Sequence, residues 1–250
     1  MAVARRLWTR DEAMLVYRLY CEISFGQIDH GNARVVQLSE AIGRTPSSVA
    51  MKLANFAHLD PVLQQRGIRG MSNVSAQDRE VASLFASDWD SSVAATAEAW
   101  APFGDVREEE IPTDVPTEAT ALAKVRLTQG FFRRAVLSSY DQACCACGVD
   151  TGALLTASHI KPWSVDPEAR TNPRNGLALC ALHDRAFDRG LMTVHPSLIV
   201  EVSQQLVAAD TIPVMRVAFR DIDGTKIRAP SKFMPDADFL AYHNERVFRG

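Results

Sequence analysis

Residues 144–190 read CCACGVDTGALLTASHIKPWSVDPEARTNPRNGLALCALHDRAFDRG, and this stretch decides the fold of the second half of the chain. It contains two pairs of soft or borderline metal ligands, Cys144-x-x-Cys147 and Cys180-x-x-His183. Each pair has the spacing that lets two side chains reach one ion from a single turn, and four such ligands complete a tetrahedral structural zinc site. The spacing therefore predicts a structural zinc. The alternative is a set of buried cysteines without a metal, since cysteine is often a core residue.

Cysteine usage in the rest of the chain favours a metal over disulfides. The chain has five cysteines, an odd number, and its first residues become charged again at Arg10 and Asp11, before the apolar core of a secretion signal could form. Clustered cysteines in a cytosolic protein bind metal more often than they pair. No apolar run approaches the roughly 20 residues that span a bilayer. We therefore expect a soluble, cytoplasmic protein.

Several polar side chains in the same stretch remain once the zinc ligands are assigned. His159 falls on a predicted strand, Asn175 lies in an Asn-Gly turn, and Asp184 and Asp188 are four residues apart. The apolar spacing from residue 177 to residue 187 predicts a helix, so the two carboxylates should project from one helical face. Any one of these residues alone would more often be structural. Their combination within 30 residues indicates a catalytic centre.

The stretches SHIKPW, NPRNGLALC and HDRAFDRG together resemble the HNH nucleases, over roughly residues 129–194. The resemblance implies a ββα-metal fold and hydrolysis of phosphodiester bonds in double-stranded DNA with Mg²⁺ or another divalent cation. It is closest to bacterial restriction-type enzymes with a separate N-terminal DNA-binding domain. It implies that His159 is the general base and that Asn175 ties the loop between strand and helix. The chain departs from the family at Ser158, where an Asp or His is common, and a hydroxyl is a poor ligand for a hard cation.

The last position of the motif can be aligned in two ways. By the pattern of the cysteine-rich members, Asp184 takes the catalytic place and His183 completes the zinc site. By the pattern of members without the cysteines, His183 itself is the ligand of the catalytic metal. The resemblance therefore implies catalytic roles for His159, Asn175 and either His183 or Asp184, with Asp184 and Asp188 as ligands of the catalytic ion. The choice for His183 stays open.

The chemistry follows from these residue types. An imidazole with an ordinary pKa of ~6.5 can take a proton from water at neutral pH. A divalent ion held by helix side chains would bind a phosphate oxygen and the leaving oxygen. Four nearby cations are candidates to hold flanking phosphates, with surface solvation as the alternative: Lys161, Arg174, Arg185 and Arg189.

The first 75 residues predict a helical domain. Thr9 and Glu12 have capping-box spacing, a second helix ends at Gly43, and a third begins after Thr45 as its N-cap. Two helices joined by a short Gly-containing turn form a helix-turn-helix candidate. Trp8 together with the stretch GRTPSSVAMKLANF (residues 43–56) resembles Myb/SANT and homeodomain-like three-helix modules, over about residues 5–60.

The third helix carries the residues that would read DNA. Ser48, Lys52 and Asn55 fall on its predicted outer face, and Arg44 lies at its entrance. Short polar side chains and cations suit contacts to base edges and phosphates, so these four residues are predicted to face a major groove. The alternative is a small helical bundle whose polar face meets water.

Charge is distributed unevenly, although the net charge is only −3. Residues 1–75 hold nine Lys and Arg against six Asp and Glu, residues 76–123 two against 11, and residues 124–250 16 against 13. Residues 104–120 have the proline and glutamate content of a linker. We predict an α+β protein with three parts: a helix-turn-helix-like DNA-binding domain (1–75), a helical connector with an acidic linker (76–123), and an HNH nuclease domain (124–250).

The C-terminal segment, residues 196–250, has weaker signals. Residues 198–203 and 213–219 read as strands, Asp223-Gly224 reads as a hairpin turn, and a final helix would leave His243 at a surface or an interface. Nothing in this segment indicates a role.

The expected function is a metal-dependent DNA endonuclease of the restriction type. The alternative is a zinc-stabilised DNA-binding protein whose nuclease-like site is inactive, which Ser158 favours. A homodimer is left open because each HNH site nicks one strand.

Overall fold

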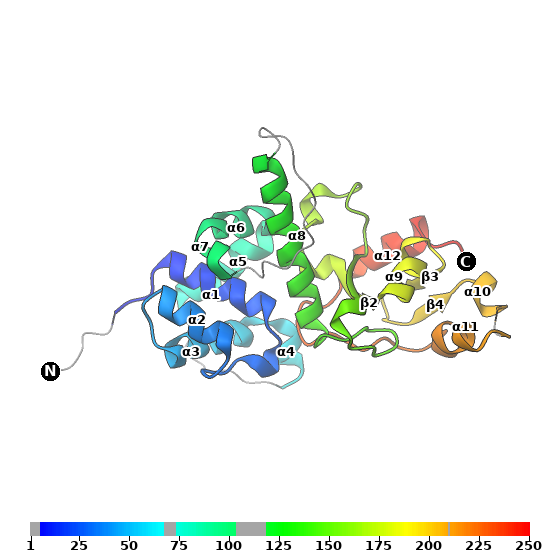
Figure 1. The fold of residues 1–250 in the computed structure, drawn as a ribbon, viewed down its shortest axis with the longest axis horizontal. Helices are drawn as coiled ribbons and strands as arrows, with labels where there is room; N and C mark the ends of the chain where they lie inside the picture. Colours follow the sequence, from blue (N-terminus) through cyan, green and yellow to red (C-terminus); the bar gives the residue numbers. More distant parts are fainter. Residues whose placement is uncertain (1–5, 68–73, 104–118, 210) are drawn as a thin grey trace. The chain divides into compact units, whose positions relative to one another are not determined.

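The computed structural model describes residues 6–67, 74–103, 119–209 and 211–250, and it describes side chains of the third range from residue 128 onward. The chain forms two compact units, Met1–Thr128 and Gln129–Gly250. The first is helical and the second combines helices with two small sheets, which confirms the α+β class (Figure 1). Most of the predicted linker, residues 104–118, lies outside the described residues. Among the helices described, none has the length and apolar character needed to cross a membrane.

Local capping chemistry sets the helix boundaries of the first unit. Thr9 and Glu12 form the predicted capping box, Gly43 adopts the left-handed conformation (φ 63°) just after the second helix, and Thr45 caps the third. The sequence predictions for these three helix ends are confirmed. The helices are α1 (Arg10–Glu22), α2 (Ala33–Ala41), α3 (Pro46–Leu59), α4 (Pro61–Gln65), α5 (Ala76–Ser87), α6 (Trp89–Ala95) and α7 (Ala97–Trp100), with 3-10 turns at Phe25–Gln27 and Ala101–Phe103.

Helices α5 and α6 complete the core of the first unit. The Tyr17 ring of α1 lies 4.9 Å from Phe56 of α3 and 4.8 Å from Phe85 of α5, measured between ring centroids. The buried guanidinium of Arg18 donates hydrogen bonds to the Val93 carbonyl and to Thr96. Residues 76–103, assigned from the sequence to a connector, therefore pack into the first unit.

The second unit is built on a two-stranded sheet followed by a helix. Strands β1 (Leu155–His159) and β2 (Gly176–Cys180) pair antiparallel, with Leu155 opposite Cys180 and His159 opposite Gly176. Helix α9 (Ala181–Asp188) follows β2 directly and packs on both strands. The prediction of a continuous helix from residue 177 is wrong for residues 177–180, because a strand buried along its whole length reads as an apolar run. The ββα unit itself agrees with the predicted fold.

The other elements of the second unit enclose this ββα core. The part of helix α8 (Ala119–Ser139) from residue 129 onward precedes it, and a second antiparallel pair, β3 (Met192–Val194) and β4 (Val200–Val202), follows it. The remaining helices are α10 (Gln204–Val207), α11 (Pro213–Ala218) and α12 (Ala237–Arg246), with 3-10 turns at Gly152–Leu154, Pro167–Ala169, Pro173–Asn175 and Arg220–Ile222.

Two sequence predictions for the C-terminal segment are wrong. Residues 213–219 form helix α11 instead of a strand, because Pro213 occupies its first turn, where a fixed φ favours a helix start. Asp223 and Gly224 follow a 3-10 turn, and the residues after them run antiparallel to the segment that enters β4, with an isolated bridge between Ile199 and Lys226, while the strand partner of β4 is β3. The predicted final helix is confirmed as α12, but His243 on it is buried, not at a surface.

Candidate metal centre and pocket

The structure brings the four predicted zinc ligands together. The pair Cys144 and Cys147 comes from the turn after α8, and the pair Cys180 and His183 comes from the junction of β2 with α9. All four ligand atoms lie within 4.8 Å of one another. His183 Nδ1 is 3.2 Å from Cys180 Sγ and 3.6 Å from Cys144 Sγ, and Cys147 Sγ is 3.9 Å from Cys180 Sγ. Ligands of a tetrahedral zinc lie about 3.5–3.8 Å apart, given bonds of about 2.0–2.3 Å. This cluster could therefore hold zinc.

The His183 ring is oriented for metal binding through Nδ1. Its Nε2 is 2.7 Å from the carbonyl oxygen of Ala218, which can only accept, so Nε2 carries the proton and Nδ1 faces the sulfur atoms. Metal-bound histidines are commonly fixed in this way by a backbone carbonyl. Burial alone would raise the pKa of Cys144, but the contact with His183 and hydrogen bonds from backbone amides lower it to about 6, whereas burial raises the pKa of Cys147 to about 12. Cys144 is thus the ligand of the pair that more readily becomes a thiolate, the form that binds metal.

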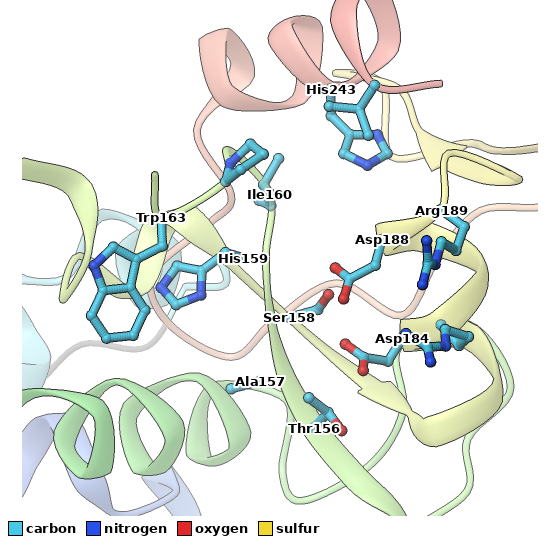
Figure 2. A pocket seen from close by; sticks show the side chains of 13 residues that line it. Thr156, Ala157, Ser158, His159, Ile160, Trp163, Asp184, Asp188, Arg189 and His243 are labelled. Atoms are coloured by element: carbon cyan, nitrogen blue, oxygen red, sulfur yellow. The ribbon is translucent and has the colours of Figure 1, made fainter. Parts of the chain in front are cut away.

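A separate pocket of about 480 Å³ opens beside strand β1. Figure 2 shows Ser158, Asp184 and Asp188 on one side of the strand, with His159 and Trp163 on the other. The alternation of side chains along a strand places neighbours 158 and 159 on opposite faces. Residues from both sides of the strand, the two carboxylates and His159 among them, line this pocket.

The two carboxylates of α9, Asp184 and Asp188, form an oxygen-rich site. The nearby arginines do not fully offset the effect of burial on the pKa of either carboxyl group. Burial raises the pKa of Asp184, and the Ser158 hydroxyl only partly opposes this rise. Burial and the neighbouring Asp184 carboxylate raise the pKa of Asp188, while Arg185 and Arg189 lower it. Ser158 Oγ is buried and faces the Asp184 carboxylate. Carboxylates and a hydroxyl at a polar pocket are oxygen ligands of the kind that hard divalent cations take.

His159 is held as a neutral imidazole with one nitrogen available. Its ring stacks on Phe132, with centroids 3.9 Å apart and planes 4° from parallel. Its Nε2 is 2.9 Å from the carbonyl oxygen of Arg170, so this nitrogen donates and Nδ1 keeps its lone pair. Burial lowers the pKa of His159, and the bond to Arg170 opposes this only in part. His159 is therefore a base whose Nδ1 is unprotonated at neutral pH.

The buried side chain of Asn175 holds the loop that follows β1 through hydrogen bonds to its backbone. Its side-chain oxygen accepts from the Lys161 amide at 2.8 Å, and its Nδ2 donates to the carbonyls of Lys161 and Ala169 at 3.1 and 3.2 Å. It does not line the pocket. Its contacts match the loop-tying role that the resemblance implied, and they place it outside direct contact with a substrate in the pocket.

The four predicted phosphate-binding cations of the second unit differ in availability. Lys161 pairs with Asp166 at 2.8 Å, and Arg174 pairs with Asp236 at 3.0 Å. Arg185 and Arg189 line the pocket next to the carboxylates. Only the last two therefore face the candidate site.

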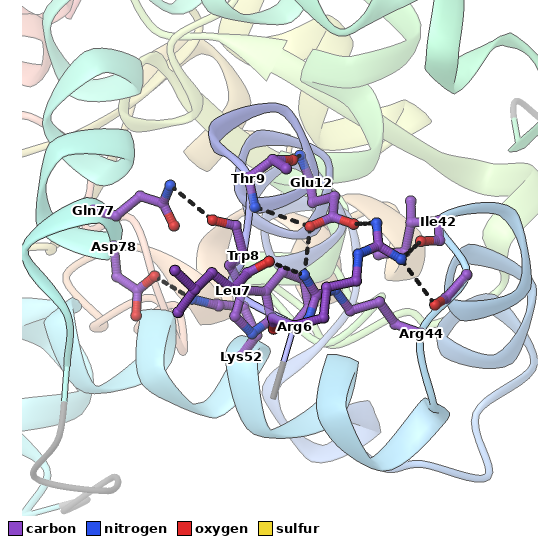
Figure 3. Close-up of polar contacts among 11 residues, drawn as sticks. Arg6, Leu7, Trp8, Thr9, Glu12, Ile42, Arg44, Lys52, Gln77 and Asp78 are labelled. Atoms are coloured by element: carbon purple, nitrogen blue, oxygen red, sulfur yellow. Dashed lines mark hydrogen bonds and ion pairs between the residues drawn. The ribbon is translucent and has the colours of Figure 1, made fainter. Parts of the chain in front are cut away.

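The first unit corrects the prediction for its DNA-facing cations (Figure 3). The Lys52 ammonium lies 2.6 Å from Asp78 of α5, and its side chain is only 5% exposed. Arg44, 7% exposed, bonds to Glu12 at 2.7 Å and to the Leu7 carbonyl at 2.6 Å. Both cations also stack on the Trp8 ring, at 4.7 and 4.0 Å from its centroid. These contacts hold the N-terminal segment and α5 on α3, so neither charge is presented to DNA.

The remaining two predicted DNA contacts are more accessible. Ser48 and Asn55 are partly exposed on α3, and the Asn55 amide also reaches Asp78 at 3.4 Å.

Two residues of the pocket were missed by reasoning from the sequence. His243 of α12 lines the pocket, stacks on Phe187 at 3.7 Å, and bonds to Thr193 and to the Phe187 carbonyl. Burial lowers its pKa to about 4, so it is a neutral structural group. Trp163 stands within the quoted SHIKPW stretch, which was the only available signal for it. No sequence signal pointed to His243.

Comparison with known proteins agrees with this geometry. Residues 144–195 match the family model described as HNH endonuclease. The matched segment contains all four cysteine-cluster ligands, both strands of the ββα unit and helix α9. A search of curated proteins found no match to the chain. Residues 144–195 are thus an HNH endonuclease domain.

Proposed function

We propose that this protein is a metal-dependent DNA endonuclease of the restriction type. One observation carries the proposal. Within the matched domain, the neutral imidazole of His159 and two carboxyl groups with raised pKa values, those of Asp184 and Asp188, line the same pocket. Phosphodiester hydrolysis needs a base for the attacking water and positive charge on the phosphate.

Each group has a definite task in this proposal. His159 Nδ1 accepts a proton from the attacking water, while the Arg170 carbonyl holds the ring in the required tautomer. Asp184 and Asp188 would hold a divalent cation, with Ser158 beside them. When bound, such a cation neutralises charge on the scissile phosphate and the leaving oxygen. Arg185 and Arg189 are placed to contact flanking phosphates.

The cysteine cluster has a structural task. We assign His183 to a zinc site with Cys144, Cys147 and Cys180, because its Nδ1 faces two of the sulfurs and the ring is fixed by Ala218. The zinc would tie β2 and α9 to the turn after α8, so its binding free energy would contribute to folding. This leaves Asp184 as the ligand of the catalytic ion.

In this proposal the first unit reads DNA, as a restriction-type function requires, through short polar side chains of α3. Ser48 and Asn55 are partly exposed on a helix that follows a Gly-containing turn. Lys52 and Arg44 are engaged inside the unit. DNA contact by this unit would thus depend on short polar side chains more than on phosphate charge.

A second function is favoured by Ser158. A hydroxyl beside the two carboxylates supplies a weaker ligand than an Asp or His, which fits a zinc-stabilised DNA-binding protein without cleavage.

Plasmid nicking tests the proposal directly. The full-length protein should nick or linearise supercoiled DNA with Mg²⁺, Mn²⁺ or Ni²⁺, and His159→Ala should not, while it keeps its zinc. Lack of cleavage by the wild type with every metal, on unmodified and modified DNA, would favour the DNA-binding alternative.

Metal analysis separates the two assignments of His183. Cys180→Ser and His183→Ala should both lose zinc and unfold the second unit at lower temperature, whereas Asp184→Asn should keep zinc and need more Mg²⁺ or Mn²⁺. If His183→Ala kept stoichiometric zinc but lost cleavage, His183 would be the catalytic ligand.

A further inference from the structure

We infer that Trp163 forms a stacking site for one unpaired nucleobase beside the scissile phosphate. This inference rests on the proposed nuclease function and goes beyond it, because it assigns the class of DNA that the pocket accepts. The indole lines the same pocket as His159 and is partly exposed. Figure 2 shows it next to the imidazole, at the side of the strand away from the carboxylates.

The indole is not committed to packing against the imidazole. Its ring centroid lies 6.0 Å from that of His159, with the planes tilted by 41°. The imidazole instead stacks in parallel on Phe132. A flat aromatic surface at the wall of a polar pocket, adjacent to the proposed base, is the type of group on which nucleobases stack.

The loop holds Trp163 in a fixed place. Asn175 bonds to both ends of residues 161–169, and Arg170 Nε donates to the Trp163 carbonyl at 3.3 Å. The Arg170 guanidinium lies 5.3 Å from the centroid of the indole ring. A rigid aromatic ring with an adjoining cation offers a base face and a nearby phosphate contact at little cost in conformational entropy.

The size and place of the pocket determine the class of substrate. Its volume of about 480 Å³ is within the range of about 300–1,000 Å³ typical of pockets that enclose a small ligand. Bases inside an intact duplex are stacked on each other and cannot reach such a wall, so a base must leave the stack to contact Trp163. The preferred substrate would therefore be DNA with an unpaired or extruded base next to the bond that is cut.

Binding measurements on the full-length protein test this without relying on cleavage. No divalent metal is added and no chelator is used, so that the DNA stays intact and zinc is retained. Single-stranded and fully paired oligonucleotides of one sequence are titrated, and both anisotropy of a labelled strand and intrinsic tryptophan fluorescence are followed. Trp89 and Trp100 are buried in the first unit, and Trp163→Phe identifies the signal that comes from Trp163.

Trp163→Leu should weaken binding of the single strand by about 5- to 150-fold, the effect expected for loss of one stacked base. Trp163→Phe should restore most of that loss, and affinity for the paired duplex should stay unchanged. Tyr242→Leu is the matched control, because Tyr242 is a partly exposed aromatic residue that does not line the pocket. Quenching of tryptophan fluorescence by the single strand should disappear in Trp163→Phe.

Equal single-strand affinity of Trp163→Leu and wild type would overturn the inference, as would equal quenching by paired and unpaired DNA. The proposed function fails separately. If Trp163-dependent quenching is present but no metal supports cleavage, the stacking site stands and the nuclease function falls. If DNA is cleaved and Trp163→Leu leaves both binding and cleavage of the single strand unchanged, the nuclease function stands and the stacking site falls.

Discussion

Replacing Lys52 by Met distinguishes a buried structural cation from a DNA contact. In the structure, Lys52 pairs with Asp78 at 2.6 Å, and the two side chains are 5% and 0% exposed. Met keeps most of the apolar stem that packs beneath Trp8 but leaves the Asp78 carboxylate buried without its partner. Removal of one partner from a buried ion pair costs about 3–5 kcal/mol, because the other charge stays desolvated.

The contacts that remain set the size of the effect. Asp78 still accepts hydrogen bonds from the Ser75 amide and the Asn55 side chain, both long at 3.4 Å, so they compensate little. We expect a loss of about 3 kcal/mol in the free energy of unfolding of the first unit. With a urea m-value of about 1–3 kcal/mol/M, the midpoint should fall by about 1–3 M.

The assay is urea unfolding followed by tryptophan fluorescence in a Trp163→Phe background. The three tryptophans that remain, Trp8, Trp89 and Trp100, all belong to the first unit. Adding Asp78→Asn to Lys52→Met should recover most of the stability, because the buried charge is removed while the side-chain oxygen that caps α5 is kept.

The competing hypothesis makes an opposite prediction. If Lys52 contacted a DNA phosphate, Lys52→Met would leave the urea midpoint unchanged and reduce the slope of log K against log salt by about 0.9. That pair of results would refute the internal role that we assign to Lys52.

Three further predictions concern the second unit. Because burial lowers the pKa of His159, cleavage should persist as the pH falls through 6.5 and decline only at lower pH; a pH–rate profile with its acid inflection at or above 6.5 would contradict this. The pKa of Asp184 is raised in the folded state, so its charged form destabilises the fold as the pH rises above the ordinary value of 3.8. Asp184→Asn should therefore raise the thermal midpoint at pH 7 without added divalent metal, and this gain should shrink as the pH falls toward 3.8; an unchanged midpoint at pH 7 would count against it. Gly190→Ala should destabilise by about 2 kcal/mol or more, because Gly190 has φ 68° and a Cβ there would lie 2.1 Å from the Val247 carbonyl oxygen. Gly224→Ala, with φ 71° and no atom within 4 Å, should show only the backbone cost of about 1–2 kcal/mol, and similar losses in both variants would argue against close packing at Gly190.

Features that depend on neighbouring residues in the chain could be predicted from the sequence. The Thr9–Glu12 capping box, the left-handed Gly43 and the Thr45 cap are interactions within a few residues, and the structure has all three. The metal-ligand spacing is also local within each pair. Two close pairs with matching ligand types were enough to predict which four side chains meet.

Features that depend on distant residues could not be predicted in this way. The direction of Lys52 is determined by Asp78, which lies 26 residues later, and a helical period alone cannot tell a polar face from a face that meets a buried carboxylate. Residues 177–180 looked helical because a strand covered on both faces loses its alternation. His243 is buried by a stack on Phe187, 56 residues earlier, which no local pattern records.

Because the side chain of Asn175 fixes both ends of the loop after β1, residues 162–168 of that loop could be exchanged together for another sequence. One amide fixes the backbone at residue 161 and at residue 169, so the positions of both loop ends do not depend on what lies between them. Doubling the length of a closed flexible loop costs only about 0.6 kcal/mol. Evolution or design could therefore exchange residues 162–168 while His159 and the ββα core stay in place. Substrate preference could change in this way independently of the hydrolytic chemistry.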